Sequence, residues 1–182
     1  TSPFKNFNMD PEFFTRDAET IARELLGAVF VRYTDGKILR ARIVETEAYF
    51  NETDPASRAC QQGDLRSTML LRGGTILVYG VHNNWLVNIV TGKEGSAEAV
   101  LIRAVEPLNF IKKCNGPGLL TKSLLIDKSF HKKHILENDE LFIDFKHKNS
   151  FETIESFRIG VKKDLPRKLR FYIKGNTWVS RS

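Results

Sequence analysis

The sequence predicts an α+β fold, in a single compact domain whose sheet is mostly antiparallel. A chain of 182 residues is long enough to bury one core. It contains no internal repeat, low-complexity tract or linker rich in Pro, Gly and Ser that would divide it. Runs rich in β-branched and aromatic residues come in pairs around short turns and outnumber the helical segments, which is typical of this fold class.

The first regular element is a predicted helix over residues 17–27, DAETIARELLG. Its apolar side chains recur at helical spacing and form one stripe: Ala18, Ile21, Ala22, Leu25 and Leu26. Glu19 and Arg23 stand four residues apart and can pair, and Gly27 is a residue type that commonly ends a helix.

Two β-hairpins are predicted to follow the helix. Residues 28–50 are expected to form two strands around Thr-Asp-Gly-Lys, a sequence with strong turn chemistry. Residues 73–90 repeat the pattern, with the β-rich runs TILVY and WLVNIV on either side of a polar tip, GVHNN.

The second half of the chain predicts three strands and one helix. Residues 97–107 are apolar almost throughout, until a Glu-Pro pair ends the strand. Residues 116–126 have helical spacing after a Gly-Pro-Gly entry. Late strands are expected in ELFIDF, residues 140–145, and in LRFYIKGNTWVS, residues 169–180.

The composition indicates an intracellular protein. No apolar run approaches the ~20 residues needed to cross a bilayer, and no charged-then-apolar leader opens the chain. Residues 1–8, TSPFKNFN, are expected to be a disordered N-terminus or a remnant of expression, with the domain itself over residues 9–182.

Cysteine and histidine usage predicts neither a disulfide framework nor a metal site. Cys60 and Cys114 are too few and too far apart, so each is interpreted as a structural thiol. His131 and His134, in HKKH, have a spacing that could reach a metal, but no Cys, Asp or Glu stands beside them. A solvated basic stretch is the favoured interpretation.

The positive charge of the chain is concentrated after residue 60. Residues 1–60 carry eight Lys and Arg against ten Asp and Glu, whereas residues 61–182 carry twenty against twelve. Basic clusters stand at residues 128–134 and 161–175. Such a surface suits nucleic acid, although a face that only keeps the protein soluble explains it equally well.

Acidic side chains in the apolar string ARIVETEAYF mark the candidate site. Because strand side chains alternate between faces, Ile43, Glu45, Glu47 and Tyr49 are expected to share one face. Arg103 stands within AVLIRAV, and a buried guanidinium needs an acidic partner or a polar cavity. Two interpretations stay open: a structural Arg–Glu bridge, or a pocket in which carboxylate and guanidinium hold one water molecule.

Two tyrosines extend the candidate site. Tyr49 and Tyr79 each end a predicted strand just before a turn-rich segment. Such aromatics usually pack at a rim, but across a polar cavity they could clamp a flat ring, as base-flipping enzymes do. A carboxylate, an arginine, two tyrosines and a basic surface together suggest an enzyme that acts on nucleic acid.

From DPEFF to WVS, nearly the whole chain resembles the alkyladenine (3-methyladenine) DNA glycosylase family. RIVETEAY is the most specific string. The other strings stand in family order: GTILVY, LIRAVEP, NGPGLLTKSLLIDKSF, RIGV and RKLRFYIKGNTWVS.

The resemblance implies a curved sheet with flanking helices and a protruding β-hairpin that enters the DNA minor groove. The implied partner is double-stranded DNA with damaged purines, bound by a monomer that needs no metal or cofactor. The implied reaction flips out 3-methyladenine, 7-methylguanine, hypoxanthine or ethenoadenine and hydrolyses the N-glycosidic bond, which starts base excision repair. No lysine lies in the matched pocket strings, so water, not a Schiff-base lysine, is the expected nucleophile.

The resemblance also implies a role for each matched residue. Glu47 would be the general base, Arg103 would help to hold the attacking water, and the main-chain carbonyl of Ile159 would contribute. Glu45 is interpreted as structural, orienting Arg103.

The implied base pocket contains Tyr49, Tyr79, Asn88 and Leu101, with Asn88 disfavouring the amino group of intact guanine. Arg58, in DPASRA, departs from the family, whose members commonly have histidine there. Because arginine would repel a cationic base, we expect a preference for neutral or deaminated lesions.

Two further departures concern DNA contact. The hairpin tip offers Val81 and His82 where family members often carry a tyrosine wedge, and the connection from Pro107 to Cys114 is shorter than the usual insert, which should weaken DNA binding. The basic residues expected at the DNA backbone are Lys122, Lys128, Lys162, Lys163, Arg167 and Lys168.

Two alternatives to a glycosylase stay open. One is a non-enzymatic nucleic-acid-binding module of the same fold, which would need neither Glu47 nor Arg103. The other is a metal nuclease that uses Glu45, Glu47 and Asp54 and is inhibited by chelators.

Overall fold

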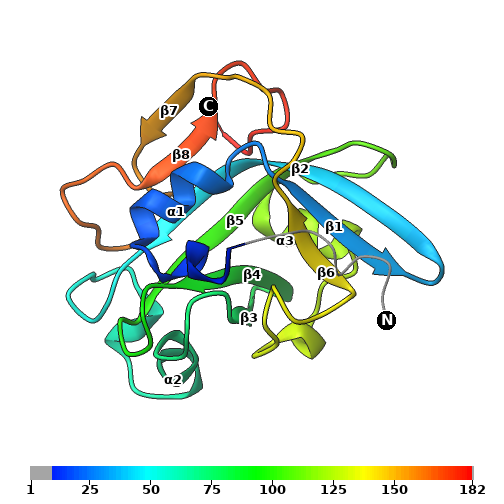
Figure 1. Ribbon diagram of the computed structural model, residues 1–182. Helices are drawn as coiled ribbons and strands as arrows, with labels where there is room; N and C mark the ends of the chain where they lie inside the picture. Colours follow the sequence, from blue (N-terminus) through cyan, green and yellow to red (C-terminus); the bar gives the residue numbers. More distant parts are fainter. Residues whose placement is uncertain (1–9, 182) are drawn as a thin grey trace.

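An antiparallel sheet is the framework of the computed structural model, which describes residues 10–181 (Figure 1). Its strands are β1 (Val29–Thr34), β2 (Lys37–Tyr49), β3 (Ile76–Val81), β4 (Asn84–Thr91), β5 (Glu98–Pro107), β6 (Leu141–Asp144), β7 (Thr153–Ser156) and β8 (Arg170–Ile173). The strand order is β3-β4-β5-β2-β1-β6, and β8 joins β2 to β7. Every strand pair is antiparallel, and the sheet curls, so the predicted α+β class with a curved sheet is confirmed.

Helices are short and flank the sheet. The α-helices are α1 (Ala18–Leu25), α2 (Asp64–Met69) and α3 (Pro117–Ser123), and the 3-10 turns are η1 (Pro11–Thr15), η2 (Arg58–Cys60) and η3 (Lys128–Phe130). None of the helices among residues 10–181 has the length and apolar character that a membrane span requires. The predicted disordered N-terminus, residues 1–8, lies outside the described residues.

Local chemistry explains the elements that the sequence predicted. Asp17 caps α1 by accepting a hydrogen bond from the Thr20 N–H at 3.0 Å, and Gly27 follows the helix at φ 85°. The β1–β2 turn contains Asp35 at φ 50° and Gly36 at φ 74°, the left-handed pair that a two-residue hairpin requires.

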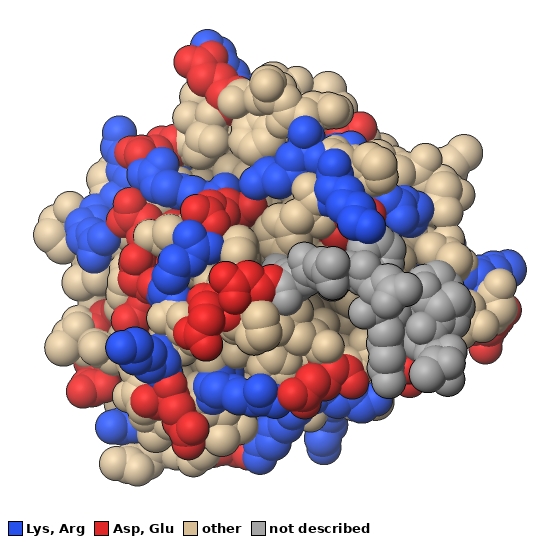
Figure 2. Space-filling view, in the orientation of Figure 1, with Lys and Arg blue, Asp and Glu red and all other residues tan. Residues whose placement is uncertain are grey.

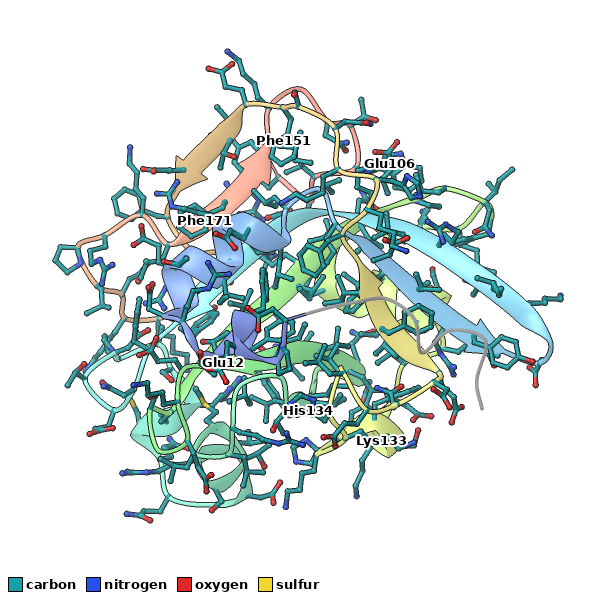
Figure 3. The ribbon with its side chains drawn as sticks, viewed as in Figure 1. Glu12, Glu106, Lys133, His134, Phe151 and Phe171 are labelled. Atoms are coloured by element: carbon teal, nitrogen blue, oxygen red, sulfur yellow. The ribbon has the colours of Figure 1, made fainter. Side chains whose placement is uncertain are left out.

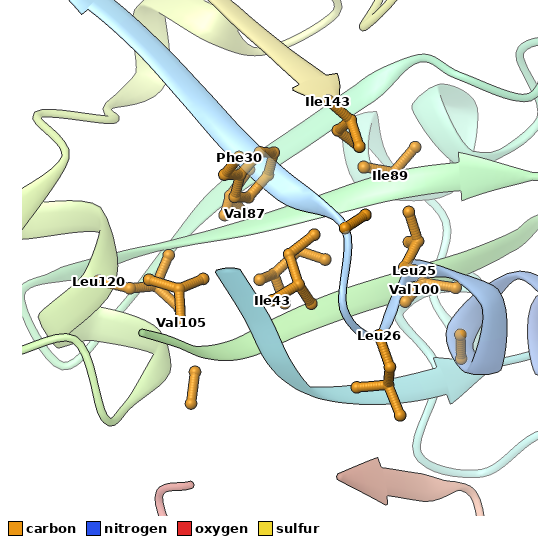
Figure 4. Close-up of a cluster of buried hydrophobic side chains, with 14 of the residues drawn as sticks. Leu25, Leu26, Phe30, Ile43, Val87, Ile89, Val100, Val105, Leu120 and Ile143 are labelled. Atoms are coloured by element: carbon orange, nitrogen blue, oxygen red, sulfur yellow. The ribbon is translucent and has the colours of Figure 1, made fainter. Parts of the chain in front are cut away.

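The sheet separates a large core from a polar site. Side chains of β2 that point to one face include Val44 and Ala48, and Thr46 donates a hydrogen bond to the Ala22 carbonyl of α1 at 2.8 Å. Ile43, expected on the face of Glu45, lies in this core instead, because the register of β2 shifts between Ile43 and Glu45. Figure 4 shows part of this main core, which also takes residues from β3, β4 and β5. Phe171 of β8 lies beside α1, with the Arg23 guanidinium 4.5 Å from its ring centre (Figure 3).

Glu47 and the residues of its face point the other way. Glu47 pairs in register with Leu101, which pairs with Asn88, so the three form one row across β2, β5 and β4. A smaller cluster, which includes Met69 and Leu77, packs on this second face under α2. The curved second face therefore carries the candidate site.

Four features differ from the sequence-based expectations. The tip predicted as GVHNN is only a two-residue turn of His82 and Asn83, because both adopt positive φ and β3 and β4 pair up to Val81 and Asn84. The strand predicted over residues 169–180 ends at Ile173, where a turn follows. The six-residue α2 and the four-residue β7 were not predicted, since elements this short show no clear periodicity.

Candidate active site

A cavity of about 760 Å³ opens on the second face of the sheet. It is large enough for a purine nucleoside. Its lining comes from β2–β5, the segment after β2, the start of α3 and the loop before β8. Among the lining residues are Tyr49, Arg58, Cys60, Met69, Tyr79, Val81, His82, Asn88, Leu101, Arg103, Ile159, Lys162 and Lys163.

Glu47 lies directly behind the wall of this cavity and is fully buried. Its Oε1 accepts a hydrogen bond from the Tyr49 hydroxyl at 2.7 Å, and its Oε2 accepts one from the Ile159 N–H at 2.7 Å. The Arg103 Nη1 lies 3.6 Å from Oε1. Glu47 itself does not line the cavity, but these three neighbours do.

Burial raises the pKa of Glu47 above its ordinary value. The Arg103 charge, the Ile159 N–H and the Tyr49 hydroxyl favour the carboxylate and oppose part of that effect. A carboxyl with a raised pKa, held beside a purine-sized cavity, is suited to accept a proton at neutral pH.

Glu45 forms the buried Arg–Glu bridge that the sequence left open. Arg103 Nε donates to Glu45 Oε2 at 3.2 Å, and Arg170 Nη1 donates to the same oxygen at 2.9 Å. Ser180 adds its N–H at 2.7 Å and its hydroxyl at 2.9 Å. The bridge and the polar cavity therefore exist together, since Arg103 contacts Glu45 and also lines the cavity.

Each pocket tyrosine has an arginine on one ring face. The Arg158 guanidinium lies 4.6 Å from the centre of Tyr49, and that of Arg58 lies 4.8 Å from the centre of Tyr79. Burial and the nearby Glu47 charge raise the pKa of Tyr49 well above its ordinary value, so its hydroxyl stays protonated and donates to Glu47.

The other predicted pocket and hairpin residues also reach the cavity. Asn88 is 3% exposed, and its Nδ2 donates to the Leu77 carbonyl at 3.2 Å. Leu101 lies beside it, and Val81 and His82 border the opening. Asn84 Nδ2 donates to the His82 carbonyl at 3.1 Å, which holds the tight turn.

The six predicted DNA-backbone residues separate into different surroundings. Lys162 and Lys163, which follow the matched string RIGV, are exposed and line the cavity. Arg167 instead pairs with Glu19 of α1 at 2.7 Å. Figure 2 shows basic and acidic side chains interspersed on one face of the molecule. Lys168 lies 5.9 Å from the ring centre of Phe157. Lys122 in α3 and Lys128 in η3 are exposed.

Sequence reasoning missed Arg158 as part of the site. Its guanidinium forms a bidentate pair with Asp54, at 2.6 and 2.8 Å, and both side chains are fully buried. Burial by itself raises the pKa of Asp54. The hydrogen bonds from Arg158 and from two backbone N–H groups lower that pKa by more than burial raises it, so the net shift is downward. The partners stand 104 residues apart, so no local pattern joins them.

The metal interpretations find no support in the described residues. Because Asp54 is held by Arg158, it is not available to a metal beside Glu45 and Glu47. His131 contacts Asp64 at 2.8 Å. His134, which is labelled in Figure 3, contacts the Gly73 carbonyl at 3.0 Å. Within residues 10–181, no group of three or more His, Cys, Asp and Glu residues is placed to hold a metal ion.

Comparison with known proteins agrees with the resemblance that the motifs carry. The profile of the family described as Methylpurine-DNA glycosylase matches residues 12–177. A proposed 3-methyladenine DNA glycosylase of Borreliella afzelii is 41% identical over 95% of this chain and 100% of its own. A relative of the same description from Aeropyrum pernix is 40% identical over 93% of this chain and 91% of its own. Another, from Clostridium beijerinckii, is 34% identical over 95% of this chain and 98% of its own. The chain belongs to the methylpurine-DNA glycosylase family, whose members are DNA glycosylases.

Proposed function

We propose that this protein is a monofunctional DNA glycosylase that removes alkylated or deaminated purines from duplex DNA. The observation that carries the proposal is the buried Glu47 carboxylate directly behind a cavity of purine size. The substrate class is 3-methyladenine, 7-methylguanine, hypoxanthine and ethenoadenine, and the reaction starts base excision repair.

Glu47 supplies the general base. As the C1′–N9 bond breaks, the base leaves with the electron pair and the sugar becomes oxocarbenium-like. A water held between Tyr49, Arg103 and Ile159 forms the new O–C1′ bond and gives its proton to Glu47. The carboxylate also stabilises the cationic sugar. A cationic base such as 7-methylguanine leaves as a neutral molecule, whereas hypoxanthine requires a proton as it leaves.

The exposed lysines at the cavity do not require a covalent mechanism. A Schiff-base lysine needs a lowered pKa, which burial in an apolar pocket or a nearby cation produces. Lys162 and Lys163 are exposed at the opening, where phosphate contact suits them better. Failure to trap a borohydride-reduced adduct with DNA is the expected result, and a trapped adduct would contradict the water mechanism.

The β3–β4 hairpin supplies the approach to DNA. Its two-residue tip is exposed beside the cavity, so His82 or Val81 can fill the gap that a flipped nucleotide leaves. Approach from the minor groove by a monomer would place the lysines at the opening near phosphates.

Arg58 sets the proposed lesion preference. Its guanidinium covers one face of Tyr79 and lines the cavity, so its charge opposes a cationic base there. Hypoxanthine should therefore be released faster than 7-methylguanine, and Arg58→His should raise the relative rate on 7-methylguanine. Equal or faster release of 7-methylguanine by the parent would contradict this preference.

A duplex with a single lesion tests the whole proposal. The protein is incubated with hypoxanthine-containing duplex, the product is heated in alkali, and cleavage at the lesion is measured with and without a chelator. Cleavage that a chelator leaves unchanged is expected. Binding without cleavage across all four lesions would instead favour the non-enzymatic module, and inhibition by the chelator would favour the nuclease.

A further inference from the structure

All five N–H groups of the Arg158 guanidinium are used inside the protein. Nη1 donates to Asp54 at 2.6 Å and to the Ala48 carbonyl at 3.0 Å, and Nη2 donates to Asp54 at 2.8 Å and to Asp164 at 2.6 Å. Nε donates to Asp164 at 3.0 Å. The side chain is fully buried, so both its position and its orientation are determined by these acceptors.

From this position Arg158 supports both donors of the catalytic carboxylate. The residue that follows it is Ile159, whose N–H binds Glu47 Oε2 at 2.7 Å. Its guanidinium also packs on the ring of Tyr49, whose hydroxyl binds Glu47 Oε1 at 2.7 Å. One buried group therefore holds the partner of each Glu47 oxygen.

We infer that Arg158, anchored by Asp54 and Asp164, is a positioning residue that keeps Glu47 deprotonated and correctly oriented for its reaction. This inference rests on the proposed role of Glu47 as general base. Arg158 itself does not line the cavity and would touch neither base nor sugar.

The mechanism is the hydrogen bonding of the charged form. A donor aimed at a carboxylate lowers its pKa, and the Ile159 N–H and Tyr49 hydroxyl act against the burial that raises the pKa of Glu47. If either donor moves, the carboxylate loses part of that support and binds a proton at a higher pH. The other charged or titratable groups that face Glu47 are Arg103 on β5, Glu45 and Tyr49 on β2, and Arg170 on β8.

Arg158→Lys is the first test. An ammonium cannot span Asp54, Asp164 and the Ala48 carbonyl together, so the Ile159 N–H should shift. We expect single-turnover release of 7-methylguanine to fall by about 100-fold, with affinity for lesion duplex within about twofold of the parent. The acid limb of the pH–rate profile should move to higher pH. This lesion leaves without added protonation, so the limb reports the base alone.

Asp164 offers a milder pair of variants. All three of its hydrogen bonds, two from Arg158 and one from the Leu165 N–H, end on Oδ1. Asp164→Ala removes that acceptor and should slow release by about tenfold and raise the limb. Asp164→Asn keeps an oxygen at that position. It should restore most of the release rate and return the acid limb close to its pH in the parent.

Arg32→Lys is the matched control. Arg32 is also buried, and its guanidinium donates to the carbonyls of Leu124 and Leu125 away from the cavity. Its loss should lower the melting temperature and leave the acid limb in place. A limb that moves in Arg158→Lys and Asp164→Ala but not in Arg32→Lys supports the inference.

Limbs that stay at the parent pH in folded Arg158→Lys and Asp164→Ala would overturn the inference. If Arg158→Lys does not fold, the Asp164 pair decides alone. If the parent releases no base from any lesion, the proposed function fails, and the inference is then judged by ¹³C NMR titration of the Glu47 carboxyl. A higher midpoint in Asp164→Ala than in the parent supports the inference, and an unchanged midpoint overturns it.

Discussion

Glu45 and Glu47 are two carboxylates on one strand and one face, both fully buried, in different chemical situations. Glu45 accepts four hydrogen bonds, from Arg103, Arg170 and both donors of Ser180. Glu47 accepts two, from Tyr49 and Ile159, and its neighbours line the cavity.

The difference supports the two proposed roles, a structural acid and a general base on one strand. A carboxylate has about four lone-pair sites. Glu45 accepts three hydrogen bonds on Oε2 and one on Oε1, whereas Glu47 accepts one on each oxygen and keeps more acceptor capacity unused. Arg103 contacts both, at 3.2 Å from Glu45 and 3.6 Å from Glu47, so one guanidinium links the two acids.

Glu47→Gln should produce the largest fall in the rate of base release. A small fall would contradict the proposed difference between Glu45 and Glu47. Removal of the general base should slow base release by about 10⁴-fold, with lesion binding nearly intact. Because the folded pKa of Glu47 is raised, its contribution to stability is present at low pH and lost as pH rises through that pKa. The variant should therefore be at least as stable as the parent at neutral pH. Single-turnover rates and urea unfolding measure the two effects.

Glu45→Gln, in contrast, should lower the free energy of unfolding. An amide leaves Arg103 and Arg170 without their carboxylate, and loss of one partner of a buried pair costs about 3–5 kcal/mol. Urea unfolding measures the loss. Glu106→Gln is the control, because Glu106 is partly buried in β5 and accepts a hydrogen bond from Asn176 at 2.9 Å. Equal losses in the two variants would show that Glu45 has no special structural role.

The pH dependence of the parent sharpens the contrast. Burial raises the pKa of Glu47, and a general base works only when deprotonated. Release of 7-methylguanine should rise with pH through a limb above the ordinary glutamate value of 4.5 and then stay level. Release of hypoxanthine should instead give a bell-shaped profile. A 7-methylguanine limb at or below 4.5 would show that Glu47 is less isolated from water than its burial indicates.

Ser180→Ala should have the smallest effect. It removes the hydroxyl that donates to Glu45 at 2.9 Å but keeps the Ser180 N–H at 2.7 Å. Unfolding free energy should fall by about 1 kcal/mol, with base release almost unchanged. A large fall in the rate of base release without loss of stability would show that Glu45 acts in the reaction and not only in the structure.

Much of the fold could be predicted because its signals are local. The stripe of α1 and the Asp-Gly turn of the first hairpin follow from spacing and backbone chemistry over a few residues. The site strings were also readable, since acid, arginine and tyrosine are unusual in buried strands. The short α2 and β7, and the two-residue hairpin tip, depended on packing that no short window contains.

The sequence by itself determined the α+β class, the order of the motifs and the shared face of Glu45 and Glu47, because strand alternation is a property of the backbone. Only the tertiary structure decided which of the two acids accepts four hydrogen bonds and which accepts two. Ser180 lies 135 residues from Glu45, and Ile159 lies 112 residues from Glu47. Hydrogen-bond partners at such separations are set by how the elements pack, so the role of each carboxylate depends on the folded chain.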